Sequence, residues 1–362
     1  MGLFSGSPQA HVGIDIGSDS IKVVELAGSY RGGFRLVHMG VAPSPPVAMR
    51  DGVPTAPEEL GGHIRALLDK SGIRLDRAVM GVGGQAVWVR EIRVPPMTKQ
   101  ELTAAVRYEA ERYLPINIKE VYMDWQVLGE TTEENRRMLD IIVVAARQDV
   151  VDQIMAVAEA ARVQLRILDV ESFALLRSVV PSGGDGQTIA VVDLGSEASD
   201  ILITEGPRLR FTRNIPIGGQ ALITAVHEAM DIDAATARSL LEEKGEVLEE
   251  GATTSDHTKE RLHDIIAPHI GDLVTEIRRS LDYYQTRSRA SVVNQILLAG
   301  GLAHLKNLDR VIAAELGIAT AVAAPFVNVR ANPAQFPPER LQAMGSTMGV
   351  AVGLAMRGGD VS

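Results

Sequence analysis

Hydrophobic and polar positions follow two different periods along this chain, and their alternation predicts a mixed α/β protein. Short, nearly continuous apolar runs, as at 12–16, 189–194 and 295–299, are typical of strands buried on both faces. Pro268 should end or kink the helix predicted at 259–287. Apolar residues at every third or fourth position predict helices at 57–72, 98–114, 149–162, 172–180, 219–230, 234–244, 259–287, 305–317 and 339–357.

The order of elements changes between residues 78 and 165. Strands at 78–83 and 88–94 are followed by a helix, two further strands and a second helix, which breaks the alternation seen elsewhere. Thr98 and Glu101 form a capping-box pattern at the start of the first of these helices. We therefore expect an α+β subdomain at 78–165, inserted into a larger α/β protein.

An internal repeat is the main signal in the sequence. GIDIGSDSIKVVEL at 13–26 and VVDLGSEASDILIT at 191–204 share an apolar–Asp–apolar–Gly–Ser pattern that is followed by a strand. The two copies lie about half a chain apart, so the repeat predicts a pseudo-twofold molecule whose halves open on the same hairpin. The glycine-rich segment 181–187 is the expected linker between the halves.

The residue types of this hairpin suit a triphosphate bound with magnesium. Asp15 and Asp193 end their strands, where a carboxylate can hold magnesium directly or through water. The glycine permits positive φ, and the serine lies beside backbone N–H groups that can cradle phosphate oxygens. Lys22 is close enough in sequence to reach back to the phosphates. One such pattern is usually an ordinary turn, but two copies that face each other would clamp a nucleotide.

Two further glycine-rich segments have open interpretations. Gly300 and Gly301 lie between a strand and a helix, where a glycine pair lets a planar ring approach the backbone. A strand-to-helix turn that needs small residues is the alternative. The run 81–86 fits the dinucleotide pattern G-x-G-x-x-A, but a strand rather than a helix is predicted after it, so we interpret it as a turn.

Composition removes several classes of function. The 362 residues suffice for about two domains, and 36 basic against 46 acidic residues give a net charge of −10. This charge argues against a general nucleic-acid binder. The absence of cysteine excludes thiolate catalysis and cysteine-ligated metals, and no Gly–Lys dipeptide is present for a P-loop. No apolar run approaches the roughly 18 residues of a membrane-spanning helix, so we expect a cytoplasmic protein.

The paired hairpins and the glycine pair resemble the actin-like ATPase superfamily, in which two phosphate loops and an adenosine loop surround ATP and Mg²⁺. The resemblance implies two pseudo-symmetric α/β domains around a nucleotide cleft, with Asp15 and Asp193 as magnesium ligands. Glu171 matches a water-orienting, catalytic carboxylate of several members. The alternative is a structural role, in which Glu171 is an acid favoured by the dipole at the N-terminus of its helix. Asp19 and Glu197 add negative charge to both loops, a departure from the superfamily pattern. Residues implied to bind the cofactor are Asp15, Gly17, Ser18, Ser20, Lys22, Asp193, Gly195, Ser196, Gly218, Gly219, Glu242, Lys244, Gly300, Gly301 and Leu302.

A closer resemblance, over nearly the full length, is to the PilM family of type IV pilus assembly proteins. It rests on VGIDIGSDSIKVVEL near the start, PPMTKQELTAAVRYEAERYLP in the insertion and EIRRSLDYYQ at 276–285. The insertion is similar to a subdomain of the division protein FtsA, whose C-terminal membrane helix has no counterpart in the closing LAMRGGDVS. The implied domains are a first actin-like domain at 1–77 and 166–184, the insertion at 78–165, a second domain at 185–338 and a helix at 339–362 that returns to the first.

The PilM resemblance implies an ATP-binding adaptor with at most weak ATPase activity, recruited to the cytoplasmic face of the inner membrane. Its implied partner is the N-terminal peptide of PilN, docked along strands 88–95 and 121–128, with the pilus membrane complex and motor ATPases reached indirectly. Trp88, Tyr122 and Trp125 are candidate anchors, unless they fill the core of the subdomain. An actin-superfamily small-molecule kinase and a filament-forming FtsA-like division protein are the alternatives, and a homo-oligomer is compatible with the fold.

Overall fold

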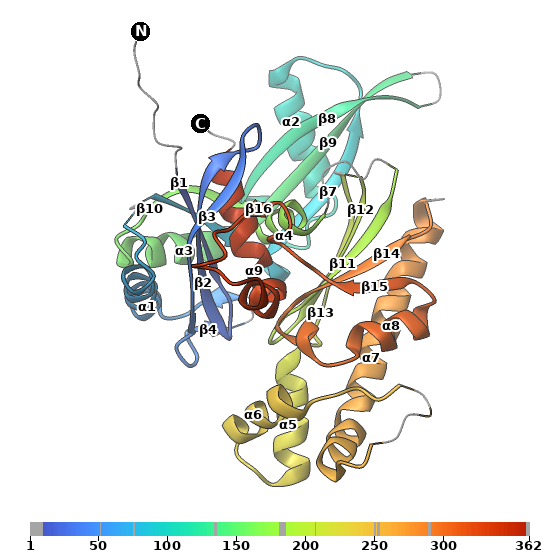
Figure 1. Ribbon diagram of the computed structural model, residues 1–362. Helices are drawn as coiled ribbons and strands as arrows, with labels where there is room; N and C mark the ends of the chain where they lie inside the picture. The colour runs from blue at the N-terminus through green and yellow to red at the C-terminus, as the bar shows by residue number, and fades with distance from the viewer. Residues whose placement is uncertain are drawn as a thin grey trace.

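Two mixed β-sheets, one from each half of the sequence, form the framework of the molecule (Figure 1). Residues 181–185 of the predicted linker at 181–187 lie outside the described residues. The computed structural model describes residues 10–50, 52–74, 77–133, 136–180, 186–206, 208–249, 251, 254–288 and 291–359.

The first sheet has six strands in the order β10-β6-β1-β2-β3-β16. β1, β2 and β3 form an antiparallel meander, and β6 and β10 continue the sheet parallel to β1. Ile21 and Val23 of β2 pack on one face, whereas Val24 and Leu26 pack on the other, so both faces are buried. The strands are β1 (Ala10–Ile16), β2 (Ser20–Ser29), β3 (Gly33–Pro43), β6 (Arg77–Val82), β10 (Gln164–Val170) and β16 (Val329–Arg330).

The second sheet repeats this topology in the order β13-β12-β11-β14-β15. β11, β12 and β13 form the antiparallel meander, and β14 and β15 continue the sheet parallel to β11. The same strand order in both sheets is the arrangement that the internal repeat predicts. The strands are β11 (Thr188–Leu194), β12 (Ser199–Glu205), β13 (Arg208–Ile215), β14 (Gln295–Gly300) and β15 (Ala319–Val322).

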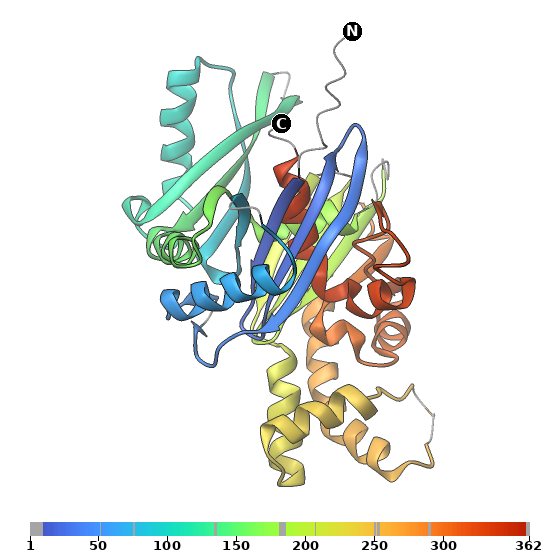
Figure 2. The same ribbon diagram turned by 60° about the vertical axis from the view of Figure 1, so that its left-hand side comes forward.

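Helices cover the outer faces of both sheets and fill the space between them (Figures 1 and 2). α4 and α9 lie between the sheets, α1 and α3 cover the first sheet, and α7 and α8 cover the second. Within the described parts of the chain, no helix combines the length and apolarity needed to cross a bilayer. The helices are α1 (Pro57–Lys70), α3 (Gln148–Ala160), α4 (Glu171–Val179), α5 (Gly219–Met230), α6 (Ala234–Lys244), α7 (His257–Ser288), α8 (Leu308–Leu316) and α9 (Pro338–Gly358).

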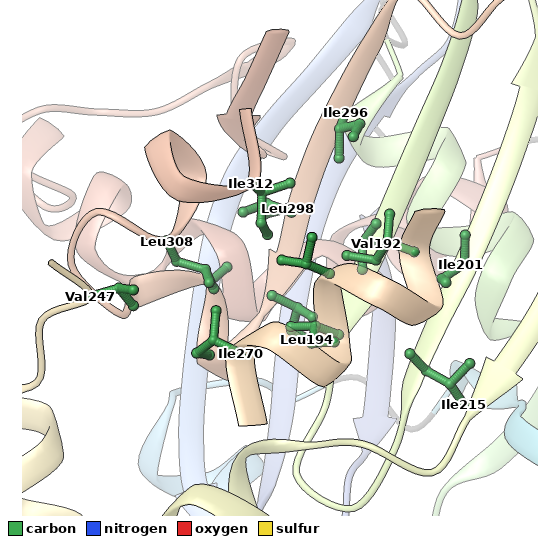
Figure 3. Packing of buried hydrophobic residues seen from close by; sticks show 14 of the residues in the cluster. Val192, Leu194, Ile201, Ile215, Val247, Ile270, Ile296, Leu298, Leu308 and Ile312 are labelled. Carbon is green, nitrogen blue, oxygen red and sulfur yellow. The ribbon is translucent and has the colours of Figure 1, made fainter. Parts of the chain in front are cut away.

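The core of the second half is an aliphatic layer between its sheet and α7 and α8 (Figure 3). Val192 and Leu194 of β11 are fully buried there, together with Ile270 of α7 and Ile312 of α8. Burying one such side chain contributes about 1.5–3 kcal/mol. The layer therefore fixes the end of β11, from which the second predicted hairpin begins.

α4 and α9 cross closely because α9 carries small residues at the crossing. A Cβ on Gly353 would collide with the carbonyl oxygen of Ala174. Ser178 Oγ donates to the Gly349 carbonyl at 2.7 Å, and an Arg177 N–H donates to the Gly353 carbonyl at 2.9 Å. α9 also contacts β1 and β14, so it joins the two halves beneath the space between them.

The separate inserted sheet is smaller than the predicted subdomain at 78–165. β7, β9 and β8 form this antiparallel sheet, with α2 on one face. β6 and β10 belong instead to the first sheet, because β6 pairs with β1 and β10 pairs with β6. α3 packs on the outer face of that sheet. The capping box is present, since the Thr98 N–H donates to the Glu101 carboxylate at 2.9 Å. The elements are β7 (Val87–Val94), α2 (Lys99–Glu111), β8 (Val121–Glu133) and β9 (Arg136–Arg147).

Of the two outcomes expected at Pro268, an end of the helix is not found, because α7 continues through it; the proline is exposed, so water can replace the hydrogen bond it loses. The segment predicted for the second domain at 185–338 also contributes β16 to the first sheet. The proline-rich segment before α1 holds the short hairpin of β4 (Met49–Arg50) and β5 (Val53–Pro54).

Candidate functional site

A cleft of about 630 Å³ opens between the two halves, where β1 and β11 end. This volume is in the range of small-molecule sites in proteins. Both predicted hairpins, the start of α4, one side of α6 and the turn after β14 line it. The predicted residues that line it are Asp15, Gly17, Ser18, Ser20, Lys22, Glu171, Asp193, Gly195, Ser196, Gly219, Glu242, Gly300, Gly301 and Leu302.

The first hairpin connects β1 and β2 through a tight turn. The strand register places Lys22 opposite Asp15, and Lys22 Nζ lies 3.2 Å from Asp15 Oδ2. The Gly17 N–H donates to the Ser20 carbonyl at 3.1 Å, and Ser44 Oγ donates to the Gly17 carbonyl at 2.6 Å. A Cβ on Gly17 would lie 3.2 Å from Lys22 Nζ. The turn therefore leaves little room for a side chain and holds the lysine against the loop, although Gly17 does not use the positive φ that a glycine permits.

The second hairpin has the same backbone but a different charge. Its register places Asp200 opposite Asp193, the position that Lys22 occupies in the first hairpin. Asn214 Nδ2 donates to Asp200 Oδ1 at 3.0 Å. A Cβ on Gly195 would lie 2.6 Å from the Ala198 carbonyl, so this turn requires glycine.

The start of α5 supports the second hairpin from below. The Gly219 N–H donates to the Gly195 carbonyl at 3.0 Å, and the Gln220 N–H donates to the Ser196 carbonyl at 2.8 Å. A Cβ on Gly218 would collide with the Ser196 carbonyl. Gly218 is therefore a packing residue beneath the loop and does not line the cleft, in contrast to the sequence-based expectation.

The glycine pair after β14 lies directly against the second hairpin. Gly300 has φ +85°, and a Cβ there would lie 2.7 Å from Asp193 Oδ1. A Cβ on Gly301 would meet nothing within 4 Å, so this residue borders open space. The turn continues into the 3₁₀ helix η3 (Gly301–His304), and the cleft is lined there by Leu302, His304 and Leu305.

The cleft concentrates carboxylates around one lysine. Burial raises the pKa of Asp193 to about 7, helped by the charges of Asp200 and Asp15. Burial and the same aspartates raise the pKa of Glu171 to about 8. Burial acts to lower the pKa of Lys22, but the ion pair with Asp15 outweighs it and the pKa is raised. A cleft with this excess of buried negative charge favours a cationic partner.

Glu171 begins α4 and is seated on the glycine run at 81–86. A Cβ on Gly81 would lie 2.6 Å from Glu171 Cγ, and one on Gly83 would collide with Glu171 Oε2. Gly83, Gly84 and Gln85 line the cleft beside it. The run is thus a turn, as interpreted from the sequence, but its glycines also make room for the buried carboxyl group. No local signal pointed to this role, because the two segments are distant in sequence.

One face of α6 lines the cleft. Arg238, Leu241 and Glu242 follow each other at helical spacing and reach the cavity. Lys244 is placed away from it, with Nζ 3.2 Å from Asp256 Oδ2. The structure therefore brings Glu242 to the cleft and does not bring Lys244.

An ion pair links the two halves across the cleft. Arg238 Nη1 of α6 lies 2.7 Å from Asp19 Oδ1 in the first hairpin. Both side chains are more than a third exposed and line the cavity. The additional charge of Asp19 therefore has a partner from the opposite half, which the sequence alone did not indicate.

The donor set fits a nucleotide that brings its own magnesium. In the described ranges, no group of three or more His, Asp or Glu side chains forms a ready metal site. Mg²⁺ typically uses one or two protein carboxylates together with waters and substrate phosphates, which suits Asp15 and Asp193. The open space beside Gly301 leaves room for such a ligand.

Comparison with known proteins gives consistent results for the fold. A structure titled PilM-PilN type IV pilus biogenesis complex matches with 27% identity and a TM-score of 0.83, covering 96% of this chain and 98% of that one. The ethanolamine utilization protein EutJ from Carboxydothermus hydrogenoformans matches with 16% identity and a TM-score of 0.57, covering 96% and 90%. MreB5 of Spiroplasma citri bound to ADP matches with 13% identity and a TM-score of 0.54, covering 95% and 94%. The predicted actin-like ATPase fold is confirmed.

The family assignment rests on nearly the whole chain. A family model described as type IV pilus assembly protein PilM matches residues 13–359, which include both hairpins, the inserted sheet and α9. The resemblance that the sequence motifs indicated is therefore confirmed, and this chain belongs to the PilM family of type IV pilus assembly proteins.

Proposed function

We propose that this chain is an ATP-binding adaptor of type IV pilus assembly, which holds Mg-ATP in the cleft and docks the N-terminal peptide of PilN. Through PilN it is recruited to the cytoplasmic face of the inner membrane and linked to the pilus motor. The observation that carries the docking function is the likeness to the PilM-PilN complex over 96% of this chain. The cleft carries the nucleotide-binding function.

Each part of the cleft has a role in this proposal. The turns at Gly17 and Gly195 present backbone N–H groups and serine hydroxyls to phosphate oxygens, with Lys22 as the adjacent cation. Asp15 and Asp193 hold Mg²⁺, which neutralises phosphate charge. Glu242 and the turn at Gly301 border the ribose and the base. The MreB5 structure of the same fold contains ADP, which supports a nucleotide as the ligand class.

Hydrolysis is the weaker half of the nucleotide function. Glu171 is the one carboxyl group of α4 in the cleft that can orient a water molecule. Its raised pKa keeps it protonated at neutral pH in the ligand-free protein, and a protonated carboxyl is a poor proton acceptor. We therefore expect slow turnover at most, and a small-molecule kinase would instead show turnover stimulated tens-fold by its acceptor.

The docking site lies where the inserted sheet meets the first domain. The inserted sheet contacts the second half through its side chains: Arg210 Nη1 lies 2.5 Å from Glu91 Oε2 of β7, and Arg208 Nη1 lies 3.7 Å from Asp140 Oδ2 of β9. β8 is the other edge strand, and in the part of the chain that the structure describes no strand pairs with its outer side. An extended peptide can add to such an edge through main-chain hydrogen bonds. We therefore place the PilN peptide along β8 rather than along β7.

Side chains at this junction supply apolar contacts. Trp88 and Trp125 are partly buried and pack against the core under α2, which supports the alternative that they fill the subdomain. Tyr122 of β8 is 49% exposed and donates a hydrogen bond to Asp152 of α3 at 3.2 Å. Met155, one turn further along α3, is 54% exposed. Both exposed side chains are candidates for apolar contact with a peptide, Tyr122 on the edge strand and Met155 on the helix that Tyr122 contacts.

Substitution of Asp193 tests the nucleotide function. Asp193→Ala removes a proposed magnesium ligand, so we expect Mg-dependent ATP affinity to fall by tenfold or more in calorimetry. Asp264→Ala, which removes an exposed aspartate of α7, is the matched control and should bind as the wild type does. Equal affinities of wild type and Asp193→Ala would remove the basis for this assignment.

A further inference from the structure

A small polar cluster joins α9 to the turn after β14 at one end of the cleft. Ser346 of α9 is 2% exposed, and its Oγ donates to the Gly300 carbonyl at 3.0 Å. The same Oγ lies 2.7 Å from His304 Nε2. His304 is exposed and lines the cleft. The imidazole is thus held at Nε2 by the serine, in a residue that lines the cavity.

The positions of the protons in this cluster follow from its donors and acceptors. Ser346 has one hydroxyl hydrogen, and the Gly300 carbonyl can only accept, so this hydrogen goes to Gly300. The serine oxygen must then accept the Nε2–H of His304. Desolvation by burial lowers the pKa of His304, which favours the neutral ring. In the neutral Nε2–H tautomer, Nδ1 carries a lone pair and is an acceptor.

The residues around His304 suit a flat ring rather than a charged group. Leu241 of α6, Leu302 and Leu305 line the same end of the cleft. Leu305 also packs against the end of α6, where its Cδ1 lies 3.0 Å from the Cβ position of Gly245. Asp193 lies beside Gly300 at the start of the turn after β14. Leu302 and Leu305 follow this turn away from Asp193 toward α6. In a nucleotide whose phosphates occupy the hairpins, the base therefore lies in this apolar region.

We infer that His304, held by Ser346, selects a purine with an amino group at C6 over one with a carbonyl group there. This inference rests on the proposed nucleotide binding. An amino group can donate to the Nδ1 lone pair. A carbonyl oxygen would instead place two acceptors against each other, and both would lose their contact with water.

ATP and ITP test this selection directly, because they differ only in the group at C6 and in the protonation of the adjacent N1. With Mg²⁺ present, we expect the wild type to bind ATP about tenfold or more tightly than ITP in calorimetry. His304→Ala should bring the ratio of the two affinities close to one. His257→Ala, which removes an exposed histidine at the start of α7, should keep the wild-type ratio.

The tautomer can be measured without any nucleotide. In protein labelled with ¹⁵N-histidine, long-range ¹H–¹⁵N correlations should show His304 as the Nε2–H form, assigned by its loss in His304→Gln. Ser346→Ala should shift the ring toward a mixture of tautomers and reduce the ATP preference. An Nδ1–H form in the wild type would contradict the inference.

The outcomes separate this inference from the proposed function. A wild type that binds ATP and ITP equally would overturn the role of His304 and leave nucleotide binding intact. An equal loss of both affinities in His304→Ala would assign the histidine to the ribose and also overturn the role. A wild type that binds neither nucleotide would overturn both proposals together.

Discussion

Lys22 and Asp200 occupy equivalent positions in the two hairpins, opposite Asp15 and Asp193. The pseudo-twofold repeat therefore preserves the backbone of the phosphate loops but reverses one charge. In the ligand-free cleft, Glu171 is surrounded by the charges of Asp15, Asp193 and Asp200, with Lys22 as the opposing cation. This excess of negative charge makes the cleft sensitive to pH and to divalent cations.

Replacing Glu171 by glutamine should change how stability depends on pH. Burial raises the pKa of Glu171 to about 8 in the folded protein, from its ordinary value of 4.5. Between these values the folded state binds more protons, so the free energy of unfolding falls as pH rises. Gln cannot titrate, so its free energy of unfolding lacks this fall. From pH 5 to pH 8, we expect the free energy of unfolding of Glu171→Gln to rise by about 1–3 kcal/mol relative to that of the wild type.

Urea unfolding of ligand-free protein at several pH values measures this difference. Glu111→Gln removes an exposed carboxyl group of α2 and is the control; its curve should run parallel to that of the wild type. Parallel curves for Glu171→Gln and the wild type would show that Glu171 is ionised in the folded cleft.

At the scale of elements, the ion pair between Asp19 and Arg238 fastens α6 to the first hairpin. We expect Asp19→Asn and Arg238→Gln each to release a fluorescent ATP analogue about two- to fivefold faster, since exposed ion pairs contribute up to about 1 kcal/mol. The direction of the change in Asp19→Asn is diagnostic. Without the ion pair, removing this negative charge near the phosphates should slow release of the nucleotide. Stopped-flow displacement measures this rate.

Two further variants separate the ion pair from general charge effects. Reversing both charges in Asp19→Arg/Arg238→Asp should restore slow release. Glu197→Gln removes a cleft-lining negative charge and should not speed release. If Asp19→Asn slows release, Arg238 acts on the nucleotide and not through Asp19.

Local features of the elements could be predicted from the sequence, and long-range ones could not. Both hairpins and the capping box of Thr98 and Glu101 depend on neighbouring residues, and the structure contains all of them. The limits of the inserted sheet depend on which distant strands pair with β6 and β10. The packing of Glu171 against Gly81 likewise brings together segments that are distant in sequence, so no local pattern predicts it. The orientation of Lys244 depends on the exact helical register of α6.

For the molecule as a whole, the inserted sheet carries the proposed docking edge and also contacts the second half. β7 begins directly after the turn at Gly83 and Gly84, which lines the cleft beside Glu171. Its Glu91 is paired with Arg210 of the second half. The other edge strand of the inserted sheet, β8, carries the exposed Tyr122 next to α3. Val87 of β7 and Tyr122 of β8 both pair with Ala146 of β9, so a bound peptide and a bound nucleotide would lie beside opposite edges of one small sheet, at the same end of its strands.

The central claim is that this chain docks the N-terminal peptide of PilN at the open edge of β8, and titration of a labelled peptide against the full chain tests it most directly. The wild type should bind, and Tyr122→Ala and Met155→Glu should each weaken binding by about tenfold or more, because they remove apolar contact or place a charge beside the edge. Tyr108→Ala, which removes a tyrosine of α2 that is 66% exposed, should leave the affinity unchanged. Full affinity in both Tyr122→Ala and Met155→Glu would contradict the docking site, and a wild type that does not bind the peptide would contradict the proposed function itself.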